Sequence, residues 1–429
     1  MLSNLDFSKA SVLVIGDLML DKYYFGSVNR ISPEAPVPIV KVNRELHTLG
    51  GAGNVANNII NLETKAYIVG AVGKDSNKSI IKQLLEEKRV THRLLERDLP
   101  TITKVRVIGE NQQIVRIDFE EIRPLGRKEL ELVKRHILSL IDEVNCLVIS
   151  DYGKGMITCE LSQFIINQAR EKRLPVIVDP KGKDWNKYKG ATVVTPNLKE
   201  LSDLLGIEVK NDDEEIEKYG VKIRRKYNLS YLLITRSEKG MSLITESGIH
   251  HIRSEAKEVY DVSGAGDTVV AVLAVAISAG INILNAVKIA NAAAGIVVGK
   301  VGTVPITLNE LRHALRGYKN TKLMYLQDLV ERVSFLRKMG KKIVFASIDC
   351  DVLRKEHIEY LRKAKEQGDI LIVGIDNDDY LKLGKNIIKL EDKVEILTSL
   401  EFVDYVTILG KDVFHSFIKE INPDIVVKR

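Results

Sequence analysis

The heptapeptide DVSGAGD, residues 261–267, runs directly into the apolar segment TVVAVLAVAIS, residues 268–278. The apolar segment predicts a buried helix. The glycines before it let backbone N–H groups converge at the helix N-terminus, where the helix dipole favours an anion. Asp267 would then stand in the first turn, where a carboxylate can accept the proton of an attacking hydroxyl during phosphoryl transfer. The purely structural alternative is an aspartate that caps the helix after a glycine turn.

Short β-rich segments precede this heptapeptide and alternate with amphipathic helical patterns over the first 305 residues. They are VLVIGD (12–17), AYIVGAVG (66–73), CLVISD (146–151), PVIVDP (175–180), ATVVTP (191–196) and YLLITRS (231–237). Such alternation predicts an α/β fold with a mostly parallel sheet and helices on both faces. Residues 38–46 and 103–121 instead alternate at period two and predict hairpins, which would form a lid or a dimer contact.

A second, shorter strand–helix series follows a polar stretch near residues 318–325. It starts with KKIVFASID (341–349) and continues through DILIVGID (369–376), YVTIL (405–409) and DIVVK (424–428). The sequence therefore predicts two domains, residues 1–318 and a smaller α/β domain of residues 319–429.

Composition narrows the classes of protein that this chain can belong to. The net charge of +6 over 429 residues forms no block of like charge, so we expect no nucleic-acid partner. The three cysteines show no CxxC spacing, which indicates a reduced, cytoplasmic protein. Residues 268–287 carry no charge, but the step at Gly280 predicts a break between two buried helices rather than a membrane span. The eight histidines show no metal-ligand spacing in the first domain.

Two more features of the first domain suggest ligand contacts. In the glycine cluster GGAGNVAN (50–57), the backbone can approach a ligand closely, and Asn54 offers a donor and acceptors for hydroxyls. Asp17 ends the first predicted strand, the position at which open α/β sheets bind ligands. The structural alternatives are a tight turn for the glycines and a helix cap for Asp17.

GGAGN and DVSGAGD, in this order and separation, resemble the two signatures of the ribokinase-like (PfkB) family of carbohydrate kinases. Longer stretches such as GDLMLDKYYFG (16–26), SDYGKGM (150–156) and TPNLKE (195–200) resemble one branch of that family. This branch is the kinase half of the bifunctional D-glycero-β-D-manno-heptose 7-phosphate kinases/heptose 1-phosphate adenylyltransferases. The resemblance implies a ribokinase-like fold and ATP-dependent phosphorylation of the heptose at its anomeric hydroxyl, for ADP-heptose and lipopolysaccharide synthesis.

The resemblance also implies roles for single positions. Asp267 matches the catalytic base, and the anion hole matches Gly264, Ala265 and Gly266. Positions matching those around ATP, with the Mg²⁺ that arrives with it, are Asn197, Leu198, Lys199, Glu200, Thr235, Gly240 and Asn291. Positions on the sugar side are Asp17, Gly50, Gly51 and Asn54. We expect no metal bound by side chains alone.

The distal phosphate of the substrate requires cations, and arginine suits bidentate contact best. Our candidates, all within the branch-specific segments, are Arg30, Lys104, Arg106 and Arg116. The alternative is that these residues belong to the solvated face of a hairpin.

The segment after Lys341 resembles the adenylyltransferase half of the same branch, but its HxGH motif reads Arg354-Lys355-Glu356-His357. Only the second histidine remains, and Glu356 puts a carboxylate where phosphates should lie. Asp349 adds a further carboxylate, and the chain stops at Arg429 where the family continues. We therefore expect a degenerate, truncated cytidylyltransferase-like domain that keeps its fold and loses adenylyl transfer, with Arg354 and His357 as remnants of its site.

Three alternatives stay open at this point: an active bifunctional kinase/adenylyltransferase, a PfkB kinase for another sugar phosphate, and a non-catalytic scaffold. In the leading interpretation the partners are a small sugar phosphate and ATP, without nucleic acid or membrane, and the protein is a cytoplasmic homodimer.

Overall fold

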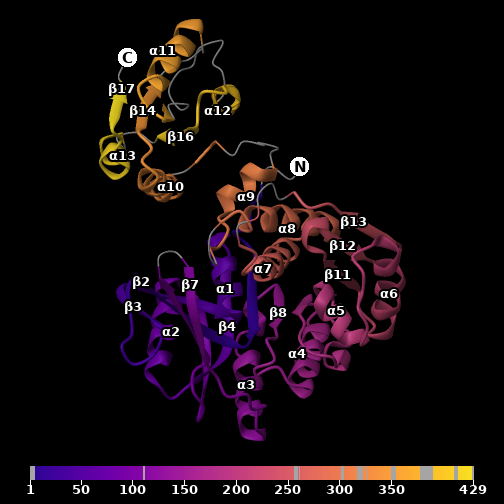
Figure 1. Ribbon diagram of the computed structural model, residues 1–429. Helices are drawn as coiled ribbons and strands as arrows, with labels where there is room; N and C mark the ends of the chain where they lie inside the picture. The colour runs from indigo at the N-terminus through magenta and orange to yellow at the C-terminus, as the bar shows by residue number, and fades with distance from the viewer. Residues whose placement is uncertain are drawn as a thin grey trace. The chain divides into compact units, whose positions relative to one another are not determined.

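The computed structural model describes residues 5–109, 112–255, 259, 261–300, 304–315, 322–324, 326–348, 354–376, 390–409 and 414–427 (Figure 1). The chain divides into two compact units, Met1–Arg316 and Gly317–Arg429. The predicted boundary at 318/319, Asp349, Cys350 and the C-terminal Lys428 and Arg429 lie outside the described residues.

The larger unit is built on a nine-stranded sheet in the order β13-β12-β11-β10-β9-β8-β1-β4-β5. The strands are β1 (Ser11–Gly16), β4 (Lys65–Gly73), β5 (Thr91–Arg97), β8 (Cys146–Ser150), β9 (Val176–Asp179), β10 (Val193–Val194), β11 (Tyr231–Thr235), β12 (Met241–Ile244) and β13 (Ile249–Ile252). Neighbours are parallel except at β11–β12 and β12–β13. The prediction of a mostly parallel sheet is confirmed, although only two residues of the predicted segment 191–196 form a strand.

Helices cover both faces of this sheet, as Figure 1 shows. Alternate residues of β1 enter different cores: Val12 and Val14 pack in one, Leu13 and Ile15 in the other. The first core contains α1 (Ala52–Asn61), α2 (Ser76–Glu87), α7 (Ala265–Ser278), α8 (Ile283–Val297) and α9 (Leu308–Leu315). The second contains α3 (Arg127–Leu138), α4 (Cys159–Glu171), α5 (Leu198–Leu205) and α6 (Asp213–Lys226), with the short helices η1 (Ile141–Glu143) and η2 (Trp185–Tyr188). A third short helix, η3 (Ser237–Lys239), joins β11 to β12.

The uncharged stretch 268–287 divides between α7 and α8, as predicted. Gly280 has φ +80°, a left-handed conformation that a helix interior does not contain. Asn282 then caps α8 by accepting the N–H of Asn285 at 3.0 Å. Within the described parts of the chain, no helix is long and apolar enough to cross a membrane.

A second sheet of four strands, in the order β3-β2-β6-β7, is separate from the central one. Its strands are β2 (Leu18–Ile31), β3 (Pro38–Gly51), β6 (Thr103–Gly109) and β7 (Gln112–Phe119). The hairpin predicted at 103–121 is confirmed as β6–β7, with its turn residues 110 and 111 outside the described residues. Residues 38–46 are not a hairpin by themselves but one strand paired with β2. The sequence did not reveal β2 because its first four residues are all buried, so they show no alternation of polar and apolar side chains.

The smaller unit has a four-stranded parallel sheet in the order β16-β15-β14-β17. These strands are β14 (Ile343–Ile348), β15 (Ile370–Asp376), β16 (Tyr405–Leu409) and β17 (Ile425–Val427). The helices are α10 (Leu326–Lys338), α11 (Lys355–Lys365), α12 (Leu390–Ser399) and α13 (Phe414–Ile421). The second α/β series predicted from the sequence is therefore confirmed.

Candidate active site

The carboxyl ends of the parallel strands bring polar residues from separate segments to one edge of the central sheet. Asp17 follows β1, Asp151 follows β8, Asp179 ends β9, Asn197 follows β10 and Thr235 ends β11. Ligands of open α/β sheets bind at this edge. The site therefore takes its groups from five neighbouring strands of the sheet rather than from one motif.

Asp267 lies in the first turn of α7 and is only 6% exposed. Gly264 caps the helix with φ +78°, a conformation that favours glycine. Two donors hold the carboxylate: Asn54 Nδ2 lies 2.7 Å from Oδ2, and the Tyr152 hydroxyl lies 2.6 Å from Oδ1. Sequence reasoning predicted Asn54 for the sugar side and did not identify Tyr152.

Burial raises the pKa of Asp267 to about 6, and the negative charge of Asp21 acts in the same direction. The hydrogen bonds from Tyr152 and Asn54 lower this pKa and so oppose part of the effect. At neutral pH the group is ionised, with a proton affinity close to that of an efficient general base.

The N-terminus of α7 can receive an anion beside this carboxylate. The first N–H groups of a helix have no partner within it, and Gly266 is exposed there. Ala265, predicted for the anion hole, donates its N–H to the carbonyl of Val262 at 3.3 Å. Among the predicted residues, exposure therefore favours Gly266 for contact with a phosphoryl group.

Gly50 and Gly51 are required by contacts within the protein. A Cβ at Gly50 would lie 2.4 Å from Asp21 Oδ2. Gly51 has φ +57°, and a Cβ there would lie 2.4 Å from the carbonyl oxygen of Asp17. The two glycines thus let the end of β3 approach the first two strands closely, and Asn54 follows in α1 beside Asp267.

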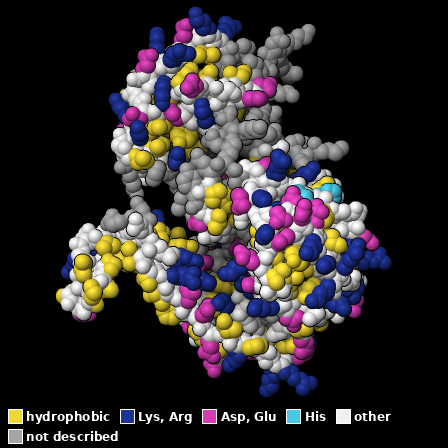
Figure 2. All heavy atoms as spheres, turned by 45° about the vertical axis from the view of Figure 1, so that its right-hand side comes forward, with side chains coloured by type: hydrophobic (Ala, Val, Ile, Leu, Met, Phe, Trp, Pro, Cys, Tyr) yellow, Lys and Arg dark blue, Asp and Glu magenta, His cyan; other side chains and the backbone are white. Residues whose placement is uncertain are grey.

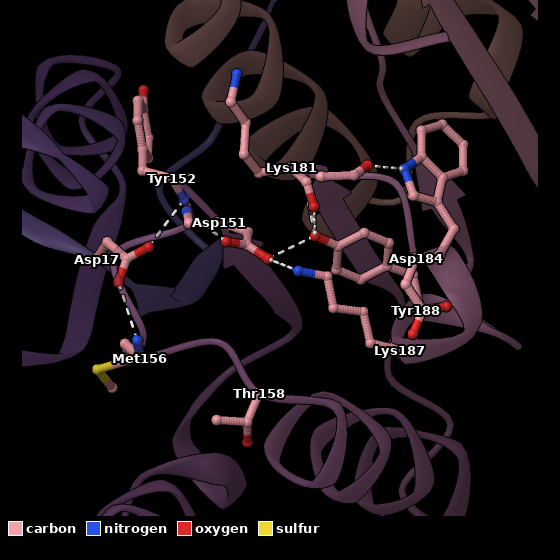
Figure 3. A network of polar contacts seen from close by, with 12 residues as sticks. Asp17, Asp151, Tyr152, Met156, Thr158, Lys181, Asp184, Lys187 and Tyr188 are labelled. Atoms are coloured by element: carbon pink, nitrogen blue, oxygen red, sulfur yellow. Dashed lines mark hydrogen bonds and ion pairs between the residues drawn. The ribbon is translucent and has the colours of Figure 1, made fainter. Parts of the chain in front are cut away.

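Asp17 lies at the predicted edge, but its carboxylate contacts the protein backbone. Oδ2 accepts the N–H groups of Tyr152 and Lys154 at 2.9 and 3.0 Å, and Oδ1 accepts that of Met156 at 3.1 Å (Figure 3). The desolvation that accompanies its burial raises the pKa of Asp17. These contacts give Asp17 a role in holding the loop after β8.

Asp21, four residues further on, is the acidic residue that sequence reasoning missed on this side of the site. It is 7% exposed and accepts a 2.5 Å hydrogen bond from Arg106 Nη1. The Arg106 guanidinium carbon also lies 5.2 Å from the centre of the Tyr23 ring. A carboxylate within the apolar run LMLD was the available signal, since buried acids are rare unless they are paired.

Three of the four predicted phosphate-binding cations share a face of the second sheet. Lys104 pairs with Asp21 across β2 and β6, and Arg106 pairs with Arg116 across β6 and β7. Directly opposed residues in a sheet project to the same side, as do residues two apart in a strand. Arg116 is exposed and forms an ion pair with Asp118 at 2.9 Å.

Arg30 is not brought to this group. It pairs with Ile39 near the far end of the β2–β3 hairpin and is exposed. Nine residues of strand separate it from Asp21, which is roughly 30 Å.

On the nucleotide side, Asn197, Glu200 and Thr235 come together. Asn197 caps α5 by accepting the Glu200 N–H at 2.9 Å, and it forms a β-bridge with Thr235. Lys181 Nζ lies 3.1 Å from Glu200 Oε1. Leu198 and the exposed Lys199 occupy the first turn of the same helix.

The other two positions predicted for ATP make contacts within the protein. Gly240 has φ +83°, and a Cβ there would lie 2.2 Å from the carbonyl oxygen of Ile252. Asn291 Nδ2 donates to the carbonyl oxygen of Arg253 at 2.8 Å. Both therefore hold the segment that follows β13.

The acidic residues suit a magnesium ion that is bound mainly by nucleotide phosphates and water. Burial and the negative charges of Asp267 and Glu200 raise the pKa of Asp179 well above its usual range. A cation nearby would relieve this repulsion, and Mg²⁺ characteristically keeps several waters. Among the described residues, no group of three or more His, Cys, Asp or Glu is arranged to hold a metal by itself.

In the smaller unit, Arg354 and His357 stand at the N-terminus of α11. His357 is buried, and its Nδ1 accepts the backbone N–H of Arg354 at 2.9 Å. The neutral ring therefore carries its proton on Nε2, which is free of this bond to act as a donor. Glu356 is exposed, so water screens the carboxylate that we expected in a partly dry phosphate site.

Comparison with known proteins identifies both units. Residues 9–310 match the family described as pfkB family carbohydrate kinase, and residues 351–429 match the family described as cytidylyltransferase-like. A relative from Nitratiruptor sp. named bifunctional protein HldE is 43% identical, over 98% of this chain and 91% of its own length. A protein of the same name from Vibrio atlanticus is 41% identical, over 99% of this chain and 89% of its own length.

Solved structures show the same fold for the larger unit. Phosphofructokinase-2 from Escherichia coli, in complex with potassium, aligns with a TM-score of 0.61 at 19% identity over 72% of this chain and 98% of its own. Ribokinase from Arabidopsis thaliana, complexed with ribose and ATP, aligns with a TM-score of 0.55 at 21% identity over 72% of this chain and 99% of its own.

These matches correct one expectation. A degenerate, truncated second domain without adenylyl transfer is not supported, because the cytidylyltransferase-like match runs from 351 to 429 and the similarity to bifunctional relatives spans nearly the whole chain. That expectation depended on the altered motif at residues 354–357, on Asp349 and on the position at which the chain stops, and none of these prevents the match to the family. The chain belongs to the pfkB family of carbohydrate kinases and joins a sugar kinase to a cytidylyltransferase-like domain.

Proposed function

We propose that this carbohydrate kinase uses ATP to phosphorylate D-glycero-β-D-manno-heptose 7-phosphate at its anomeric hydroxyl. The product, heptose 1,7-bisphosphate, would serve ADP-heptose and lipopolysaccharide synthesis in the cytoplasm. The observation that carries the proposal is the buried carboxylate of Asp267, which two donors hold at the N-terminus of α7. Residues 1–318 would carry this reaction.

Different residues of the site would assist different parts of a direct, in-line transfer of the phosphoryl group from ATP to the sugar. Asp267 accepts the proton of the anomeric hydroxyl, and the N–H groups at the start of α7 stabilise charge on the transferring phosphoryl group. Mg²⁺ bound to ATP neutralises phosphate charge when present, and Glu200 would face it through water. A covalent intermediate is not required, so no nucleophilic Ser or Cys is assigned.

The charged face of the second sheet supports a phosphorylated acceptor. Lys104, Arg106 and Arg116 project to the side that also carries Asp21. Asp21 suits sugar hydroxyls as an acceptor, and the cations suit a phosphate at the far end of the sugar. The branch-specific sequence segments select heptose 7-phosphate among sugar phosphates.

Phosphorus NMR of the purified protein with Mg·ATP and heptose 7-phosphate tests this proposal. We expect ADP and a new anomeric phosphate signal, both absent with Asp267→Asn. Turnover of fructose 6-phosphate but not of the heptose would favour a PfkB kinase for another sugar phosphate. Absence of turnover with either acceptor would leave the scaffold alternative.

We propose adenylyl transfer from ATP to heptose 1-phosphate as a second activity, carried by residues 319–429. The supporting observation is His357, whose ring is oriented by the Arg354 N–H at the start of α11. Arg354 and the Nε2–H of His357 would stabilise the charge of departing pyrophosphate. Pyrophosphate release from ATP and heptose 1-phosphate, lost in His357→Ala while kinase turnover persists, is the expected result. Absence of pyrophosphate with the unaltered protein would refute this second activity and leave the first untouched.

We also propose a homodimer formed through the second sheet. Val115, Ile117 and Phe119 are 45%, 44% and 53% exposed, and they alternate along β7 with Arg116 and Asp118. One face of β7 is therefore apolar and open, and hydrophobic side chains line the sheet that projects from the larger unit in Figure 2. Association of two such faces would remove this apolar surface from water.

A further inference from the structure

The loop between β8 and α4 is held by two carboxylates, as Figure 3 shows. Asp17 accepts the N–H groups of Tyr152, Lys154 and Met156. The loop thus wraps around a side chain that lies 135 to 139 positions earlier in the sequence. Three backbone bonds to one carboxylate leave this segment little freedom to shift.

Asp151 holds the other side of the same loop. Its Oδ1 accepts the Gly153 N–H at 2.7 Å, and its Oδ2 accepts the Tyr188 hydroxyl at 2.6 Å and Lys187 Nζ at 2.5 Å. The side chain of Asp151 is only 1% exposed. Tyr152 is therefore fixed between two anchored neighbours.

Tyr152 extends from this anchored loop to the base. Its hydroxyl donates to Asp267 Oδ1 at 2.6 Å, while Asn54 donates to Oδ2. Burial and the charge of Asp267 raise the pKa of Tyr152 well above its usual value, so the phenol remains a neutral donor. With one donor on each oxygen, the plane of the carboxylate is fixed before substrate arrives.

We propose that Tyr152 is a positioning residue for the base Asp267, and that Asp17 acts on catalysis through the loop that carries Tyr152 rather than by contact with the sugar. The proposal rests on the proposed function only in taking Asp267 as the base. It assigns a function to the segment SDYGKGM (150–156), whose sequence by itself shows only a resemblance to one kinase branch.

The charges around Asp267 explain why the hydrogen bond from Tyr152 is needed to keep this carboxylate ionised. Two residues donate hydrogen bonds to Asp267: Asn54 from α1 and Tyr152 from the loop. Two acidic residues interact with it electrostatically: Asp21 from β2 and Asp179 from β9. Of the two acidic neighbours, Asp21 favours the protonated form of Asp267 through its negative charge. Tyr152 and Asn54 favour the ionised form that accepts the substrate's proton.

Tyr152→Phe tests this role directly, with Tyr67→Phe as the matched control. Tyr67 is buried and, like Tyr152, donates its hydroxyl to a carboxylate: Glu143 Oε2 lies 3.0 Å away. Tyr67 lies on β4, away from the loop that carries Tyr152. In Tyr152→Phe we expect the acid limb of the pH profile of kcat/KM to move to higher pH by about one unit. We expect kcat to fall about tenfold, because the charged carboxylate of Asp267 loses a hydrogen bond. The Mg·ATP KM should stay unchanged. An acid limb that does not move, with a fall in kcat no larger than in Tyr67→Phe, would overturn the proposal.

Asp17→Asn, alone and combined with Tyr152→Phe, tests the action through the loop. A carboxamide has a single acceptor atom, so at least one of the three loop N–H groups loses its partner. If Asp17 acts through Tyr152, the acid limb moves in the same direction, and the second substitution lowers kcat by less than about twofold further. If instead the fall in kcat of the double variant equals the product of the falls in the two single variants, and Asp17→Asn also raises the sugar KM strongly, Asp17 contacts the sugar.

Folding is checked with Asp75→Asn, which alters another carboxylate that accepts two backbone N–H groups, those of Lys78 and Thr101. Thermal unfolding of the two Asn variants shows whether Asp17→Asn has lost its fold, in which case Tyr152→Phe decides alone. The Asp267 carboxyl can also be titrated without substrate by NMR of protein labelled with ¹³C-aspartate, its signal identified by its loss in Asp267→Asn. If the Asp267 carboxyl titrates at a different pH in Tyr152→Phe, but the unaltered enzyme does not phosphorylate heptose 7-phosphate, the proposed function is refuted. The inference that Tyr152 positions Asp267 would still hold.

Discussion

Asn54 on α1 donates its side-chain N–H to Oδ2 of Asp267, joining residues 213 positions apart over 2.7 Å. This bond connects the two glycine-containing signatures of the chain. Gly50 and Gly51 bring the start of α1 to the first strands, and Gly264 starts α7 at the same edge of the sheet. The two signatures act as parts of one site, which neither could form alone.

Asp267→Asn should abolish most kinase turnover. The amide keeps the size of the side chain but cannot accept a proton, so kcat should fall by about 10²- to 10⁴-fold. An assay of ADP release with heptose 7-phosphate measures this, and thermal unfolding confirms that the variant is folded. A fall of less than about threefold would remove Asp267 from the role of base.

The rate should depend on pH through the same carboxyl. Its pKa is raised to about 6, so Asp267 becomes protonated below that pH and can no longer accept a proton. We expect kcat/KM to be level above pH 7 and to fall about tenfold per unit below pH 6. An aspartate with an ordinary pKa would keep the profile level down to pH 5, and that result would contradict the prediction.

Arg106→Ala should weaken binding of the phosphosugar more than binding of ATP. Loss of a charge-assisted contact predicts a rise of about tenfold or more in the sugar KM, with little change in that of ATP. Arg93, an exposed arginine on β5, provides the control substitution Arg93→Ala. Equal effects of Arg106→Ala on both KM values would count against a contact with the distal phosphate.

Gly50→Ala should disturb Asp21 and, with it, the pair that Asp21 forms with Arg106. The added methyl would start 2.4 Å from Asp21 Oδ2, so the carboxylate must move. We expect a higher sugar KM and a loss of about 1–3 kcal/mol in the free energy of unfolding. Gly126→Ala is the control, because a Cβ there meets only Glu129 Oε2 at 3.6 Å. Wild-type KM and stability in Gly50→Ala would show that the site tolerates displacement of Asp21.

The proposed dimer predicts a change of mass in one surface variant. Ile117→Asp would place a charge in the apolar face of β7, and light scattering should show a monomer in place of a dimer. Ile207 is 45% exposed, close to the 44% of Ile117, so Ile207→Asp is the control and should remain dimeric. A monomeric wild-type protein would refute the dimer itself.

Sequence pattern predicted the architecture of both units because strand–helix alternation is a local property. It failed at β2, where burial on both sides removes the alternation that marks a strand. At the site, the signatures located Asp267 and Asn54, which the structure places in direct contact. In the second unit, the sequence predicted a degenerate domain from the altered residues at 349 and 354–357 and from the chain end, but residues 351–429 still match the cytidylyltransferase-like family.

By itself, the sequence determined the α/β class, the two strand–helix series and the family, because apolar periodicity and glycine-rich turns are set by neighbouring residues. Only the tertiary structure decided which acidic residue serves which purpose. Asp17 and Asp21 are four positions apart in one apolar segment. The first contacts a loop 135 or more positions later, and the second contacts Arg106, 85 positions later. Such pairings depend on how distant segments pack, and short-range pattern contains no information about them.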